Sequence, residues 1–122
     1  MDDRIQLAVT VGDHSHPELA RGLERAGLNV LTAKTGIKAL ELLKALGLRC
    51  VVVLTRLLPT QMAISFLTRL QADYPDCKTR FPVLVGADER GRTEIPVDCP
   101  CVVGTVSEGD LNAVETAVKD VI

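Results

Sequence analysis

The stretch "CVVVLTRLLPTQ", residues 50 to 61, begins with an unbroken apolar run from Cys50 to Leu54 and then enters a turn. An apolar run of this length without polar alternation is typical of a strand that is buried on both faces of a parallel sheet. Thr55 follows the run, and Pro59 comes four residues later. Ligands and reactive groups of open α/β sheets lie beyond the carboxyl ends of the strands. Thr55 therefore stands where a carboxylate or a nucleophile would be expected.

Apolar runs alternate with helical patterns along the rest of the chain, which is typical of a parallel α/β sheet. The predicted strands cover residues 5–11, 29–33, 50–54, 82–86 and 101–105, and the predicted helices cover about 17–26, 36–46, 61–72 and 111–121. Residues 87–100 contain glycine and proline breakers and few apolar residues, so no full helix is placed there. The pattern predicts a single domain over residues 1–122, an α/β fold of the flavodoxin-like kind. We expect a doubly wound, five-stranded parallel sheet of order 2-1-3-4-5, with a fourth helix that is short or absent.

The composition excludes several classes of function. The net charge is −2 with no basic stripe, and aromatic residues make up only 2% of the chain, so a nucleic-acid partner is not expected. No segment approaches the ~20 apolar residues of a membrane span, and the charged start "MDDRIQ" does not resemble a signal peptide. We therefore expect a cytoplasmic protein with neither a nucleic-acid nor a membrane partner.

The four cysteines are Cys50, Cys77, Cys99 and Cys101. Cys99 and Cys101 form a C-P-C sequence, which differs from the C-x-x-C pair of zinc and redox sites. Cys50 and Cys101 each begin an apolar run, so buried free thiols are the favoured interpretation. A metal or redox site is the alternative.

The middle of the chain contains an ordered motif. Val30, Ala33, Gly36, Ala39 and Leu40 form the pattern V-x-x-A-x-x-G-x-x-A-L over the predicted second strand and helix. This pattern resembles that of response-regulator receiver domains. A further match follows in the Leu58-Pro59 pair after the apolar strand, and Phe66-Leu67 fits the third helix. The resemblance extends more loosely over the whole chain, and it implies the same fold and a role in two-component signalling.

The positions that carry the chemistry of receivers are replaced in this chain. The resemblance places Thr55 at the position of the aspartate that accepts the phosphoryl group, and Gly86 at the position of the hydroxyl residue of the fourth strand. It places Gly104, within one residue, at the position of the lysine that ends the fifth strand, and Thr105 replaces the proline that follows. Of the acidic pair that holds Mg²⁺ in the family, at best Asp13 remains. The chain is therefore similar to a degenerate receiver, or pseudo-receiver, outside the usual phosphorelay chemistry.

The loop "GDHSH", residues 12–16, offers a candidate metal site. Asp13, His14 and His16 carry carboxylate and imidazole groups, which are common ligands of divalent metals. The alternative is a polar loop that leads into a helix capped by Ser15, which has capping-box spacing to the glutamate three residues later.

A second resemblance concerns cobalamin-binding domains, which carry D-x-H-x-x-G after the first strand. Asp13 fits the first position, but Ser15 replaces the histidine and Glu18 replaces the glycine. Thr55 and Gly86 are similar to the hydroxyl and glycine positions of that family.

No Ser/His/Asp order and no P-loop are present, so we expect no enzyme and no cofactor. The main hypothesis is a phosphorylation-independent signalling or scaffold module that binds a protein partner, with a homodimer as a further expectation. The alternative is a small-ligand, cobalamin or metal sensor that uses a pocket among Asp13, Thr55, Gly86 and Gly104.

Overall fold

A computed structural model of the chain describes residues 4–13 and 15–122. Its sheet holds five parallel strands, β1 (Leu7–Val11), β2 (Asn29–Ala33), β3 (Cys50–Leu54), β4 (Val83–Ala87) and β5 (Val102–Ser107). Their order across the sheet is β2-β1-β3-β4-β5, so the predicted architecture is confirmed. β3 lies at the centre, and every residue of it is buried.

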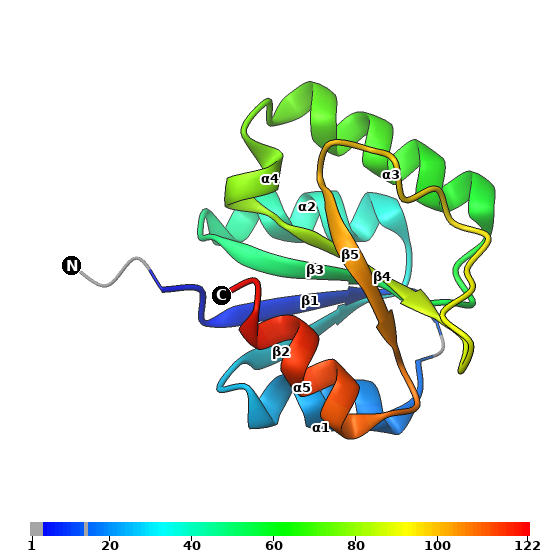
Figure 1. The fold of residues 1–122 in the computed structure, drawn as a ribbon. Coiled ribbons are helices and arrows are strands. Elements are labelled where there is room, and N and C mark those ends of the chain that lie inside the picture. Colours follow the sequence, from blue (N-terminus) through cyan, green and yellow to red (C-terminus); the bar gives the residue numbers. More distant parts are fainter. Residues whose placement is uncertain (1–3, 14) are drawn as a thin grey trace.

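The helices cover both faces of the sheet, as Figure 1 shows. α1 (Pro17–Arg25) and α5 (Leu111–Lys119) lie on one face, and α2 (Gly36–Leu46) and α3 (Thr60–Asp73) lie on the other. β3 serves both cores because its side chains alternate: Val52 and Leu54 pack under α2 and α3, whereas Val51 and Val53 pack against α1 and α5. This double burial explains the unbroken apolar run of β3. None of the helices in the described ranges is both long and apolar enough to cross a membrane.

The connection from β4 to β5 contains no helix in residues 88–101, all of which the structure describes. The segment returns along the α3 side of the sheet (Figure 1, yellow to orange) and is held there by the buried Ile95. Its first turn is closed by Asp88, whose Oδ1 accepts the backbone N–H groups of Arg90 and Arg92 at 2.9 Å each. The absence of a full helix here agrees with the prediction, whereas the short helix α4 (Cys77–Arg80), before β4, was not predicted.

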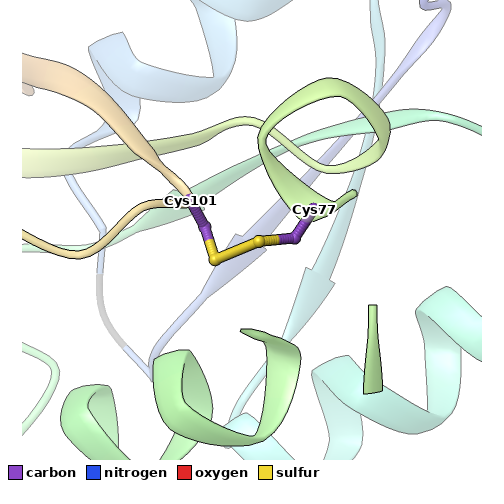
Figure 2. The surroundings of a disulfide bond; sticks show 2 residues. All are labelled: Cys77 and Cys101. Carbon is purple, nitrogen blue, oxygen red and sulfur yellow. A yellow bond between two sulfur atoms is a disulfide. The ribbon is translucent and has the colours of Figure 1, made fainter. Parts of the chain in front are cut away.

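The structure corrects the interpretation of the cysteines. Cys77, at the start of α4, and Cys101, directly before β5, form a disulfide with their Cα atoms 5.4 Å apart (Figure 2). Cys101 is therefore not a free thiol; the sequence could not indicate the pairing, because it depends on how the chain folds α4 against the start of β5. Cys50 is a buried free thiol as predicted, and burial raises the pKa of that thiol to about 11. Disulfides are typical of oxidising compartments, so this bond does not support the expected cytoplasmic location. That location stays a prediction.

Candidate functional site at the carboxyl ends of the strands

The carboxyl ends of the parallel strands meet at one edge of the sheet, and an open depression of about 710 Å³ lies there. Its lining comes from the segments that follow four different elements and includes His16, Arg56, Leu57, Asp88, Glu108 and Asp110. Acidic and basic side chains are mixed around it, so it has no dominant charge. This edge is where the fold places binding sites in general.

Thr55 lies at this edge but is fully buried. Its backbone N–H and its hydroxyl both donate to the carbonyl oxygen of Val11, at 3.0 Å each. The hydroxyl fills the space beside Gly12, whose φ of 135° and lack of a side chain allow the close approach. The Thr55 hydroxyl therefore ties the end of β3 to the end of β1 and is not presented as a nucleophile.

Glu108 is a buried acidic residue of this edge that the sequence pattern did not indicate. It follows β5 directly, is only 6% exposed, and its Oε2 accepts the backbone N–H of Arg56 at 2.6 Å. Burial raises the pKa of this carboxyl group, whereas the Arg56 N–H and the charges of Arg56 and His16 act in the opposite direction. The sheet edge thus contains a buried carboxylate, but the carboxylate comes from β5 and not from β3.

Gly86, in β4, makes room for this carboxylate. A Cβ atom at Gly86 would collide with the carboxylate of Glu108 and would lie 2.7 Å from the backbone nitrogen of Arg56. The glycine at this position is therefore required by the close approach of Glu108. The structure brings Gly86 and Glu108 together directly beside Thr55.

Gly104 does not lie at this edge, which corrects the predicted end of the fifth strand. β5 continues to Ser107, and a register shift at Val83/Leu84 pairs Gly104 with Leu84 in the sheet. Gly104 instead borders a second depression, of about 550 Å³, together with Arg49 and Val121. The extra residue of the shift could not be read from the apolar run, because a bulge changes the pairing without changing the pattern.

Of the candidate metal ligands of the first loop, the structure describes Asp13 and His16. Asp13 is exposed, and His14 lies outside the described residues. His16 caps α1 by accepting the N–H of Glu18 on Nδ1 at 3.2 Å, so the predicted Ser15 cap is wrong. In the described ranges, no group of three or more histidine, cysteine, aspartate or glutamate side chains is placed to hold a metal ion.

Comparisons with known proteins support the fold. No protein-family model and no curated protein sequence matches the chain. Among solved structures, chemotaxis response regulator CheY4 of Vibrio cholerae is similar with a TM-score of 0.68 and 19% identity, over 98% of this chain and 100% of that one. A CheY-like receiver domain protein of Methanospirillum hungatei has a TM-score of 0.71 and 16% identity, over 94% and 92%. The receiver domain of an HD domain-containing protein of Pseudomonas fluorescens has a TM-score of 0.70 and 16% identity, over 97% and 87%. The chain therefore has the fold of response-regulator receiver domains, as the resemblance implied.

Proposed function

We propose that the chain is a receiver-like signalling module of a two-component-type regulatory system that acts by protein–protein contact without being phosphorylated at the strand-end edge. The observation that carries this proposal is the buried Glu108 carboxylate, bonded to the Arg56 backbone beside Thr55. Phosphoryl transfer depends on positive charge that neutralises the phosphoryl oxygens. The Glu108 carboxyl group supplies no positive charge in this position and repels a phosphoryl group whenever it is ionised, and Thr55 offers only a hydroxyl that is bonded to Val11.

The first test is incubation of the chain with acetyl phosphate and Mg²⁺, followed by intact-mass measurement. A phosphorylatable receiver domain in the same reaction shows that the reagent is active. We expect no mass increase for this chain, because neither the acceptor nor the compensating charge is present. A stable gain of one phosphoryl group that maps to Thr55 or Asp13 would contradict the proposal.

The contact surface is proposed to include segment 88–101, which occupies the place of a helix between β4 and β5. Val97 is 48% exposed on this segment, although it is apolar. Once a partner has been isolated, Val97→Asp is expected to weaken its binding by at least about tenfold, or 1.4 kcal/mol. Leu48→Asp is the matched control, because Leu48 is also an exposed apolar residue but lies before the central strand β3 and not in segment 88–101. Equal loss in both variants would argue against this surface.

The proposal includes the absence of enzymatic activity, a protein partner and no nucleic-acid or membrane partner. It is supported by the mixed charge of the sheet edge and by the bonded state of the Thr55 hydroxyl. A homodimer is a further prediction, which the molar mass from light scattering would test.

A small-ligand sensor is the second candidate function, and the depression of about 710 Å³ favours it. Arg56 and His16 could meet an anionic group there, opposite Asp88 and Glu108. Native mass spectrometry of the purified chain tests for a retained metabolite. Absorbance after mixing with hydroxocobalamin tests the cobalamin hypothesis, and the absence of a spectral change would exclude it. Calorimetry with zinc tests the metal hypothesis, and the absence of heat would exclude it.

A further inference from the structure

Glu108 joins two loops that are distant in the sequence. Its carboxylate, directly after β5, accepts a hydrogen bond from the backbone of Arg56, 52 residues earlier and directly after β3. Gly86 lies against the carboxylate from the strand between them. We call this arrangement the Glu108 clasp.

The closed clasp favours the neutral form of the carboxyl group. Removal of the group from water is the largest influence on its pKa and raises it, and this influence outweighs the Arg56 N–H and the charges of Arg56 and His16. Three further carboxylates line the same depression: Asp88 and Glu89, which follow β4, and Asp110, which precedes α5. Arg90 and Arg92 also line it. Asp88 is partly neutralised by Arg92 at 3.4 Å, and Asp110 accepts the N–H groups at the start of α5.

The clasp has room to open. Glu108 and Arg56 both line the depression of about 710 Å³, which is open to solvent, so water lies within reach of a Glu108 side chain that leaves the Arg56 N–H. An ionised carboxyl group gains hydration in such an open position, whereas a neutral one gains little. The two protonation states therefore differ in their preference for the closed and open positions, which is the condition for a population shift.

We propose that Glu108 is a proton-responsive clasp, closed on the Arg56 backbone when its carboxyl group is protonated and increasingly open when the proton is lost. The proton is then the ligand that holds the loop after β3 in place. The direction of the pH effect follows from linkage. A carboxyl group that binds its proton more tightly in the closed state stabilises that state at low pH. This contribution is lost as the pH rises through the pKa of the group in the closed state. This role goes beyond the proposed signalling function and does not depend on it.

The test is hydrogen exchange of the Arg56 amide, measured by NMR on the full chain between about pH 4 and about pH 8, with correction for intrinsic exchange. The protection factor of this amide is expected to fall as the pH rises, by up to about tenfold for each pKa unit by which the closed state raises the pKa of Glu108. Glu108→Gln keeps the shape but cannot ionise, so its protection factor is expected to stay constant. Glu41→Gln, an exposed carboxylate on α2, is the matched control and is expected to behave as the wild type.

Two results would overturn the proposal. One is a wild-type Arg56 protection factor that does not change over this range, or that changes equally in Glu108→Gln. The other requires no variant: a side-chain carboxyl carbon signal of Glu108 that titrates at the ordinary pKa of glutamate would remove the preference of the closed state for the proton. A signal that titrates above the ordinary pKa, together with the Arg56 amide, supports the clasp.

Discussion

Reduction of the Cys77–Cys101 disulfide is expected to lower the free energy of unfolding by about 3.5 kcal/mol. The bond closes a loop with a sequence separation of 24 residues, and the chain-entropy model gives about 12 cal/mol/K of lost unfolded-state entropy for such a loop. For 122 residues the entropy of unfolding is roughly 0.26 kcal/mol/K, so the midpoint of thermal unfolding should fall by about 14 °C. Circular dichroism with and without a phosphine reductant measures both values.

The variant Cys77→Ala/Cys101→Ala provides the control, because the reductant should not change its midpoint. Cys99→Ala should unfold like the wild type under oxidising conditions, since Cys99 is outside the bond. A loss below about 1 kcal/mol on reduction, or an equal effect of the reductant on the double variant, would refute the argument that the bond limits the unfolded chain.

Three further predictions concern buried positions. Gly86→Ala should cost about 1–3 kcal/mol in urea unfolding, because its Cβ collides with Glu108; a smaller cost when Glu108→Ala is also present would identify that contact as the cause. Thr55→Val should cost about 1 kcal/mol through loss of the hydroxyl bond to Val11, and an unchanged urea midpoint would argue against that bond. Cys50, whose thiol has a pKa of about 11, should resist iodoacetamide at pH values near 8 until the protein unfolds; rapid labelling of the native chain would contradict its burial.

The fold could be predicted from the sequence because the pattern of apolar residues depends directly on which faces of each strand are buried. The run from Cys50 to Leu54 alternates between two cores, and only a central parallel strand requires apolar residues on both faces. The weak pattern of residues 87–100 likewise predicted a connection in which a helix is short or absent. Both features depend on local composition, which a single sequence shows directly.

The site was less accessible from the sequence because it depends on register. The fifth strand was expected to end at Thr105, whereas the observed strand continues for two more residues and places Glu108 at the edge beside Gly86. The glycine was interpreted as a missing hydroxyl, whereas the structure explains it by the space that Glu108 needs. The pairing of Cys77 with Cys101 depends on tertiary contact in the same way.

The proposed function requires that the strand-end edge does not respond to a phosphoryl group. The most direct measurement is an NMR titration of the chain with beryllofluoride and Mg²⁺, which mimic the phosphorylated state, while the backbone amides of Thr55, Arg56 and Glu108 are followed. At constant pH these three signals are expected not to move, because no acceptor carboxylate stands at Thr55 and the Glu108 carboxyl group lies beside it. Saturable shifts of the same three signals that require Mg²⁺ would contradict the proposed function.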